Sequence, residues 1–201
     1  MLPEETPHYS KGNFDLEIEF DFGFKEVVGN AYRGDYDLSS HAKLSGEDFS
    51  IVEDGNKVIP HVVEPSFGID RTIHAVLLHC FVEDKKRGWD WFRFPPRIAP
   101  YSVAVFPLVS KDSLPEKAKE VFTQLKNCFD VFYDESGSIG KRYARSDEIG
   151  IPFAITIDYQ TLKDNTVTIR SRDTTEQVRT KIEDLASVIW KLVYEEKDLK
   201  N

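Results

Sequence analysis

The first part of the chain carries the pattern of antiparallel strands. Apolar and acidic residues alternate strictly over residues 14–22, and this period of two is typical of a strand with one buried face and one face in water. After Gly23, residues 26–32 are predicted to form the antiparallel return strand. Residues 58–64 are a further short apolar run, so we expect another strand that ends at Pro65.

Two helices are predicted in the same part of the chain. Residues 39–43 favour a short helix with either Ser39 or Ser40 as its N-cap, because a serine hydroxyl can accept a hydrogen bond from a free N–H of the first turn. Residues 69–78 are predicted to form a second helix. Its apolar side chains recur at helical spacing, at Ile69, Ile73, Val76 and Leu77.

The pattern of apolar and polar residues changes at Pro95 and Pro96. Two consecutive prolines stop a helix or an inner strand, because each lacks a backbone N–H and has a fixed φ. We therefore predict a domain boundary here, between domains at residues 1–97 and 98–201.

Beyond this boundary, segments with strand and helix patterns alternate. Residues 102–109 are almost continuously apolar, which is the pattern of a strand buried on both faces. Residues 174–177 have the spacing of a capping box, which predicts a last helix with an inner face of Val178, Ile182, Leu185, Ile189 and Leu192. The other predicted elements are strands at 131–133, 153–159 and 166–170 and helices at 114–128 and 141–149. This order predicts a compact α/β domain with a mixed sheet.

Composition and charge limit the possible functions. The chain has 201 residues, of which 40% are hydrophobic and 30% charged, ordinary values for a protein with a hydrophobic core. Its 26 basic and 35 acidic residues give a net charge of −9. Because affinity for phosphates grows with the number of Lys and Arg side chains presented, a generally basic nucleic-acid coat protein is excluded. A local basic patch is still compatible with this charge.

The two cysteines predict neither a disulfide framework nor a metal site. Cys80 and Cys128 lie far apart, without a CxxC pair or a Cys/His cluster, so we expect no bound metal and an intracellular protein. The first ten residues are acidic and polar, unlike a signal peptide. The apolar runs are far shorter than the roughly 20 residues of a membrane span. These observations favour a cytoplasmic protein that does not enter a membrane.

Residues 64–71 carry the most informative motif. A strand ends at Pro65, a glycine allows a tight turn, and a helix begins with Arg71 in its first turn. Helix N-termini favour anions, and a guanidinium fork suits phosphate. Glu64, at the end of an apolar strand, is a candidate for binding an amine. The alternative is a plain strand-to-helix corner at which Asp70 and Arg71 form a solvated pair.

The segment Glu64-Pro65-Ser66-Phe67-Gly68-Ile69-Asp70-Arg71 resembles motif 3 of class II aminoacyl-tRNA synthetases, in the form carried by the homodimeric glycyl-tRNA synthetases. Segments upstream of it resemble the same family, at 7–10, 23–26, 32–38 and 59–62. Segments downstream resemble its anticodon-binding domain, at 99–101, 134–142, 147–150 and 172–179. The resemblance covers nearly the whole chain. It implies an α+β part with a partial class II antiparallel sheet, followed by an α/β anticodon-binding domain with a mixed sheet.

The resemblance implies roles for five residues. Arg71 is similar to the motif 3 arginine that holds the γ-phosphate of ATP, and Glu64 belongs to the same ATP-binding region. Glu64 and Ser66 match residues that line the glycine pocket, where the glutamate pairs with the substrate ammonium. Glu26 matches a second acidic residue of that pocket, and Arg33 lies near it. Carboxylates suit this task because they form charge-assisted hydrogen bonds with an ammonium. Asp70 is a departure, since many class II enzymes carry glutamate before the arginine.

Two motifs of class II synthetases have no counterpart in this sequence. Motif 1 supplies the dimer interface and motif 2 the arginine that grips the α-phosphate, and the thirteen residues before Phe14 cannot hold them. The resemblance therefore implies the C-terminal part of a longer synthetase, with a missing N-terminal catalytic part, and we expect the chain alone to be inactive. The intact enzyme would be a homodimer that joins glycine to tRNA(Gly) through a glycyl-adenylate, using ATP and Mg²⁺.

A second set of candidates lies in the predicted anticodon-binding domain. Lys141, Arg142 and Arg145 form a local basic cluster that could hold phosphates of a single-stranded loop. Glycine anticodons end in two cytosines, and a carboxylate can accept from the cytosine amino group. The candidate carboxylates are Asp147, Glu148 and Glu176. The alternative for each of these residues is an ordinary exposed charge.

The rival interpretation of the whole chain is a non-catalytic protein. It would be a synthetase-like accessory protein that binds nucleic acid with the same elements. The presence of Glu26, Glu64, Ser66 and Arg71 argues against it, because a pure binding module has no need of an amino-acid pocket.

Overall fold

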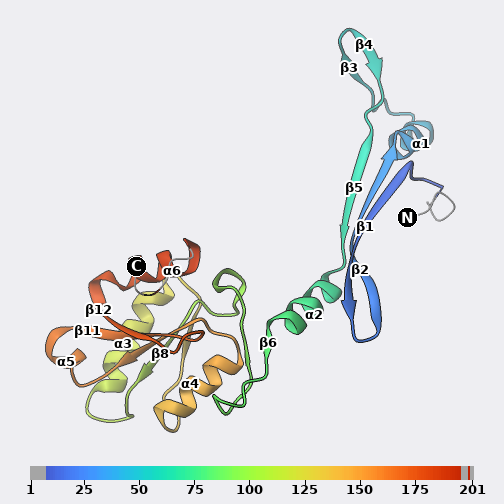
Figure 1. Cartoon of the computed structure of the whole chain (residues 1–201). Coiled ribbons are helices and arrows are strands. Elements are labelled where there is room, and N and C mark those ends of the chain that lie inside the picture. Colours follow the sequence, from blue (N-terminus) through green and yellow to red (C-terminus); the bar gives the residue numbers. More distant parts are fainter. Residues whose placement is uncertain (1–7, 196–198, 200–201) are drawn as a thin grey trace. The chain divides into compact units, whose positions relative to one another are not determined.

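The computed structural model describes residues 8–195 and residue 199 and contains two units, Met1–Leu78 and His79–Asn201, each with its own sheet (Figure 1). Residues 1–7, which include Pro7 of the segment 7–10, lie outside the described residues. Among the described residues, no helix has the length and apolar composition needed to cross a bilayer.

The first unit is built on an antiparallel sheet of three strands in the order β1-β2-β5. The predicted strand and its return are confirmed as β1 (Gly12–Phe20) and β2 (Gly23–Gly34), which turn at Gly23 with a φ of 94°. The predicted strand at 58–64 is only partly correct, because β4 (Asn56–Val58) ends there and β5 spans Val62–Phe67.

Pro65 lies inside β5 and does not end it, contrary to the prediction. It is paired with Asn30 of β2. Among the described residues, β2 is the only strand that pairs with β5, so the missing N–H of Pro65 can face the unpaired edge.

Two helices and a small hairpin complete the first unit. α1 spans Tyr36–Ser45, so the helix predicted at 39–43 exists but begins earlier, and its N-cap is Asp35 instead of a serine. The predicted second helix is confirmed as α2 (Ile69–Cys80). β3 (Ile51–Glu53) pairs with β4.

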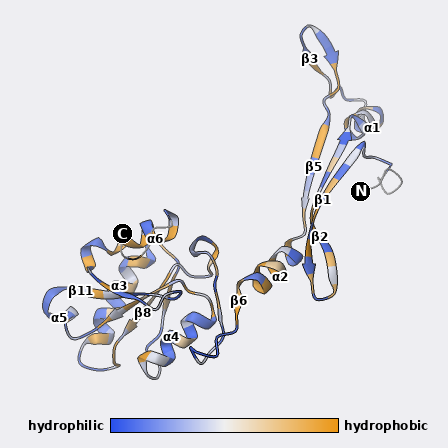
Figure 2. Ribbon diagram, viewed as in Figure 1, coloured by the Kyte–Doolittle hydropathy of each residue, from blue (hydrophilic) through white to orange (hydrophobic). Residues whose placement is uncertain are grey.

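The first unit has a small core and many exposed apolar side chains. Phe20, Val27 and Ala75 form its buried cluster. Phe14 is 80% exposed, and Phe67 and Ile69 are 65% and 71% exposed. Figure 2 shows hydrophobic stretches along β5 and α2. Apolar surface gathered in this way usually marks an interaction site.

The second unit has a five-stranded mixed sheet in the order β12-β11-β10-β8-β9. β8 (Val103–Pro107) is parallel to β9 (Val131–Tyr133) and to β10 (Phe153–Ile157), whereas β11 (Thr166–Ser171) and β12 (Gln177–Lys181) are antiparallel neighbours. The predicted mixed sheet is therefore confirmed. The remaining elements are β6 (Phe81–Val82), β7 (Trp91–Phe92), α3 (Leu114–Lys126), α4 (Ile139–Glu148), α5 (Thr161–Asp164) and α6 (Leu185–Tyr194).

Hydrophobic clusters cover both faces of this sheet. Val103 and Val105 of β8 belong to the cluster that buries residues of α3 and α6, while Ala104 and Phe106 belong to the cluster against which residues of α4 pack. All five residues of β8 are buried. The continuous apolar run therefore correctly predicted a strand with no solvent face.

The predicted capping box at 174–177 is wrong. Residues Gln177–Lys181 form β12, and Val178 pairs with Ile169 of β11. The last helix starts only at Leu185. Val178 and Ile182 still pack against the core. The apolar spacing therefore correctly predicted that these side chains face the core, but it assigned Val178 to a helix instead of a strand.

The segment 79–97 belongs to the second unit. The buried Arg172 side chain donates to the carbonyl of Phe94 at 2.8 Å and to the carbonyl of Gly150 at 2.7 Å. Gly150 has a φ of +82°, and a Cβ there would lie 2.3 Å from the Phe94 ring. The predicted domain boundary after Arg97 concerns how a longer protein is divided into domains. The contacts of residues 79–97 show only how this segment packs, so the boundary stays a prediction.

Candidate functional site

One face of the first sheet gathers the residues of the predicted amino-acid pocket. Directly opposed residues of an antiparallel pair share a face. Ser66 pairs with Gly29, and Glu64 pairs with Ala31. Glu64 and Ser66 therefore point to the same side of β5, together with the open position at Gly29.

Glu26 reaches this same face by folding over Gly29. A Cβ built on Gly29 would lie 2.7 Å from Oε1 of Glu26. Since that Cβ would point to the face shared with Ser66, the Glu26 carboxylate occupies the space that a side chain at position 29 would need. The sheet thus brings together Glu26, Glu64 and Ser66.

Arg71 is fixed at the end of this face. Gly68 donates its N–H to the carbonyl of Val27 at 2.9 Å, which holds the first turn of α2 against β2. Arg71, in that first turn, donates from Nη1 to the carbonyl of Glu26 at 2.8 Å. Its side chain is exposed. A guanidinium is therefore anchored to the main chain at Glu26 and accessible to an anion.

Arg33 makes more contacts in this site than the sequence predicted. Its Nε and Nη2 donate to both oxygens of Asp37 at 2.5 and 2.7 Å, and its Nη1 donates to Glu64 at 2.7 Å. The Arg33 hydrogen bonds hold the pKa of Asp37 below its usual value. Arg33 therefore orients Glu64. No helical i, i+4 rule could have revealed this contact, because Arg33 lies in β2 and only Asp37 lies in α1.

Arg142 does not belong to an exposed basic cluster, contrary to the prediction. It is 1% exposed. Its guanidinium donates to the backbone carbonyls of Pro107 and Gly137, the latter at 2.6 Å, and thereby ties the end of β8 to the start of α4. Burial lowers the pKa of Arg142. The side chain is used inside the fold and is not presented to a phosphate.

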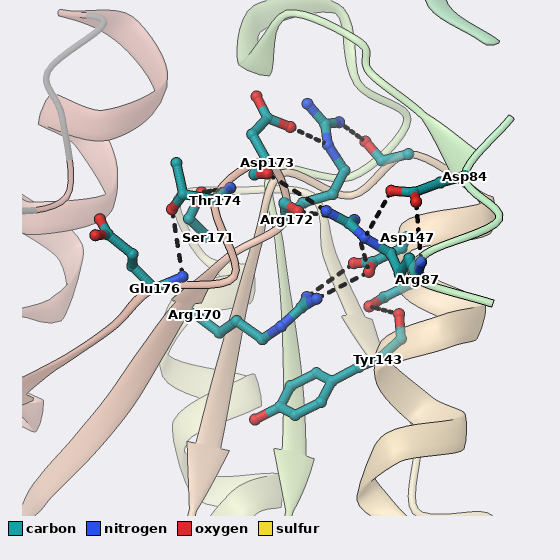
Figure 3. A network of polar contacts seen from close by, with 12 residues as sticks. Asp84, Arg87, Tyr143, Asp147, Arg170, Ser171, Arg172, Asp173, Thr174 and Glu176 are labelled. Carbon is teal, nitrogen blue, oxygen red and sulfur yellow. Dashed lines mark hydrogen bonds and ion pairs between the residues drawn. The ribbon is translucent and has the colours of Figure 1, made fainter. Parts of the chain in front are cut away.

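Asp147 is also buried and is not placed to read a base. Arg170 of β11 donates to both of its oxygens at 2.9 Å, and Arg87 donates to Oδ2 at 3.3 Å. Figure 3 shows these two arginines converging on the Asp147 carboxylate in α4. This charge cluster links β11 and α4 to the segment that contains Arg87.

The other candidates of this unit lie at its surface. Lys141, Glu148 and Glu176 are exposed. The side chain of Arg145 is 40% exposed and forms an ion pair with Asp134. Glu176 follows the turn after Arg172, and Figure 3 shows it on the far side of Arg170 from Asp147. These four residues, from α4 and the β11–β12 turn, remain candidates for contacting a nucleic acid.

Comparison with known proteins decides the family. Residues 102–192 match the anticodon binding domain family. The chain is 45% identical over 193 residues to the glycine–tRNA ligase of Borrelia hermsii, covering 92% of this chain and 43% of that protein. It is 44% identical over 196 residues to the glycine–tRNA ligase of Treponema denticola, covering 92% of this chain and 44% of that protein. The corresponding identity to the Clostridium acetobutylicum ligase is 47% over 187 residues, covering 90% and 40%.

The chain corresponds to the C-terminal region of glycyl-tRNA synthetases. It spans less than half the length of the relatives it matches. Within this synthetase region, the five-stranded sheet of the second unit lies inside the matched anticodon-binding domain. The first unit, with Glu26, Glu64, Ser66 and Arg71, precedes that domain.

Proposed function

We propose that the chain supplies the glycine-binding face and the anticodon-binding domain of a glycine–tRNA ligase. The observation that carries the proposal is the arrangement of two carboxylates and a serine on one sheet face, with an anchored guanidinium at its end. Two carboxylates suit an ammonium, and a guanidinium suits a phosphate. The names of the relatives support the same reaction.

In the proposed reaction, Glu26 and Glu64 hold the ammonium of glycine and Arg71 binds the triphosphate of ATP, which enters as its Mg²⁺ complex. A carboxylate oxygen of glycine attacks the α-phosphorus, and pyrophosphate leaves. A ribose hydroxyl at the 3′ end of tRNA(Gly) then attacks the glycyl carbonyl. AMP leaves with the electron pair of the broken C–O bond, and the hydroxyl proton passes to water. The residues of this chain act by positioning and by charge.

The exposed apolar surface of the first unit supports a role for the remaining catalytic part. Phe14, Phe67 and Ile69 would each be costly to leave in water, at about 25 cal/mol per Å² of apolar area. We propose that the part of the enzyme that carries motifs 1 and 2 covers this surface, in a cytoplasmic homodimer. On this proposal the chain by itself is inactive, because it lacks the arginine that grips the α-phosphate.

Gly29→Ala is expected to weaken glycine use selectively. The new methyl group would occupy the place of the Glu26 carboxylate, and loss of a charged hydrogen bond costs about 1.5–3 kcal/mol. In a chimaera in which this chain replaces the matching 43% of the Borrelia hermsii ligase, we expect the KM for glycine to rise roughly 10- to 100-fold. The KM for ATP should change little.

Gly12→Ala is the matched control for this experiment. Gly12 also lies in the first sheet, and a Cβ there meets nothing within 4 Å. Steady-state ATP–pyrophosphate exchange at varied glycine measures both variants. Equal glycine KM values for Gly29→Ala and Gly12→Ala would show that Glu26 does not need its present position.

Lys141→Glu is expected to weaken tRNA(Gly) binding by the whole chain. Each phosphate contact to a single strand contributes about 0.7 to the slope of log affinity against log salt. We therefore expect that slope to become less steep by about 0.7, with a roughly 10-fold loss of affinity at low salt. Filter binding or anisotropy at several salt concentrations measures both.

Lys163→Glu provides the control, because Lys163 is an exposed lysine of α5 in the same unit. A transcript with a changed anticodon should bind the wild-type chain more weakly than tRNA(Gly). Identical effects of the two lysine variants would remove Lys141 from the interface. Binding of duplex DNA as tightly as tRNA(Gly) would instead favour a non-catalytic nucleic-acid-binding protein.

A further inference from the structure

The hairpin β6–β7 carries an arginine that the proposed glycine-binding face does not use. The two strands pair Val82 with Trp91. In the loop between them, the carboxylate of Asp84 accepts the backbone N–H of Arg87 at 2.9 Å and lies 3.5 Å from its Nε. The Arg87 guanidinium also lies over the Trp91 ring, 4.3 Å from the ring centre. Its own hairpin therefore fixes the direction of this side chain, which is 11% exposed.

Arg87 reaches the turn that joins β11 to β12. Its Nη1 donates to the carbonyl of Arg172 at 2.9 Å, and its Nη2 donates to the carbonyl of Asp173 at 3.3 Å (Figure 3). The two carbonyls belong to consecutive residues, 85 and 86 positions along the chain from Arg87. A guanidinium is planar, and its N–H groups form a rigid fork. A fork that grips two consecutive carbonyls fixes the orientation of both peptide groups.

The turn that Arg87 grips has a conformation that needs support. Thr175 has a φ of 60°, in the left-handed region that is costly for a β-branched residue. Two backbone hydrogen bonds close the turn, from Thr175 to the carbonyl of Ser171 at 3.0 Å and from Ser171 to the carbonyl of Glu176 at 2.9 Å. Such a conformation persists only where the surrounding structure fixes it. The contacts of Arg87 are part of that support.

The same turn determines where the Glu176 carboxylate lies. The backbone N–H of Glu176 donates to Oγ1 of Thr174 at 3.3 Å, and its carbonyl accepts from the N–H of Ser171. Both backbone groups of Glu176 are therefore held by residues of the turn. The residue is exposed, and a carboxylate can accept a hydrogen bond from a cytosine amino group. That bond requires a donor–acceptor distance of about 3 Å, so a shift of the turn would weaken it.

Resting on the proposed function, we propose that Arg87 is a positioning residue for anticodon recognition. It holds the β11–β12 turn so that the Glu176 carboxylate lies where it accepts a hydrogen bond from a cytosine of the anticodon. Arg87 itself grips main-chain groups and does not touch the base. The match to the anticodon binding domain family begins at residue 102. The proposal therefore extends the part of the chain that reads tRNA to a hairpin that precedes the matched residues.

The test measures how strongly the whole chain prefers tRNA(Gly) to transcripts in which an anticodon cytosine is replaced by uracil, which has no amino group. One transcript is made for each of the two cytosines. A well-formed contact to one base changes affinity by roughly 5- to 150-fold, so we expect a preference in that range over at least one transcript. Glu176→Ala should lower the preference over that transcript.

Arg87→Met is expected to lower the same preference to less than about a third of its value in the parent chain, because the turn is no longer held. Arg87→Lys keeps the charge beside Asp84 and Asp147 but loses the fork, and it should restore only part of the preference. Lys86→Met is the matched control, since Lys86 is an exposed cation of the same loop, and it should leave the preference unchanged. All affinities are measured below the temperature at which any variant begins to unfold.

Asp147→Asn distinguishes the grip on the turn from general packing of the charge cluster. It removes the carboxylate that Arg87 and Arg170 share and leaves both carbonyls that Arg87 grips, so the preference should be retained. An undiminished preference in Glu176→Ala or Arg87→Met, or an equal loss in Asp147→Asn and Arg87→Met, would overturn the proposal while the proposed function stands. A parent chain that binds all three RNAs equally would overturn the proposed function, and this inference with it.

Discussion

Asp147→Ala is expected to destabilise the second unit by about 3–5 kcal/mol, the cost of breaking a buried ion pair by removing one partner. The Asp147 side chain is 1% exposed, and those of Arg170 and Arg87 are 6% and 11% exposed. Without the carboxylate, the Arg170 guanidinium would lose its charge partner in a largely dry site, whereas Arg87 would keep its ion pair with Asp84 at 3.5 Å. Urea unfolding followed by tryptophan fluorescence measures the effect, since Trp89, Trp91 and Trp190 all lie in this unit.

Asp173→Ala is the control for that measurement. Asp173 pairs with the buried Arg172 at 2.7 Å, but its own side chain is 47% exposed. Arg172 keeps its hydrogen bonds to the carbonyls of Phe94 and Gly150 without it, so we expect a clearly smaller loss than for Asp147→Ala. A double variant, Asp147→Ala with Arg170→Met, should recover part of the loss because it removes one stranded charge. A cost for Asp147→Ala no larger than that for Asp173→Ala would contradict the structural role of the cluster.

Arg71→Ala is expected to reduce glycine-dependent ATP–pyrophosphate exchange by about 100- to 1,000-fold in the chimaera, the range for loss of one preorganised charge-stabilising donor. The side chain is exposed and, among the described residues, its one hydrogen bond is to the Glu26 carbonyl, so the fold should tolerate the change. Arg71→Lys keeps the charge and loses the fork, and it should recover only part of the activity.

Lys25→Ala tests whether the effect of Arg71→Ala is merely one of net charge. Lys25 is an exposed cation on β2, close in sequence to Glu26. Its removal should leave exchange within a few-fold of the parent, while thermal unfolding confirms that both variants are folded. A similar loss for Lys25→Ala and Arg71→Ala would mean that Arg71 has no specific contact with ATP.

The helices and strands that could be predicted are those whose burial follows from the local order of apolar and polar residues. Residues 14–22 alternate and β1 is a strand, but of its apolar face Phe20 is buried while Phe14 and Leu16 are exposed. Residues 102–109 are apolar because β8 is covered on both faces.

The prediction that a strand ends at Pro65 was wrong because an edge strand can contain a proline. Whether a strand lies at an edge depends on which strands pair, and the local sequence does not show this. The prediction of a helix at Val178 was wrong because the same apolar spacing can also bury side chains of a strand.

The candidate site was predicted best where the sequence resembles a known motif. Glu64, Ser66 and Glu26 do share a sheet face, but the position of Glu26 depends on the missing side chain of Gly29. The prediction that Arg142 and Asp147 contact a nucleic acid was wrong because the sequence does not show the partners that bury them. Arg142 donates to the carbonyl of Pro107, 35 residues away. Asp147 pairs with residues 23 and 60 positions away. The order of residues near Asp147 in the sequence does not show burial that depends on such distant partners.

Amino-acid-dependent ATP–pyrophosphate exchange by the folded chimaera shows directly whether Glu26, Glu64 and Ser66 form a glycine pocket. The glycine-binding face described here predicts rapid exchange with glycine, little with alanine, and none when the chain is supplied alone. A folded chimaera that shows no exchange with glycine, or equal exchange with alanine, would contradict the claim that Glu26, Glu64 and Ser66 form a glycine pocket.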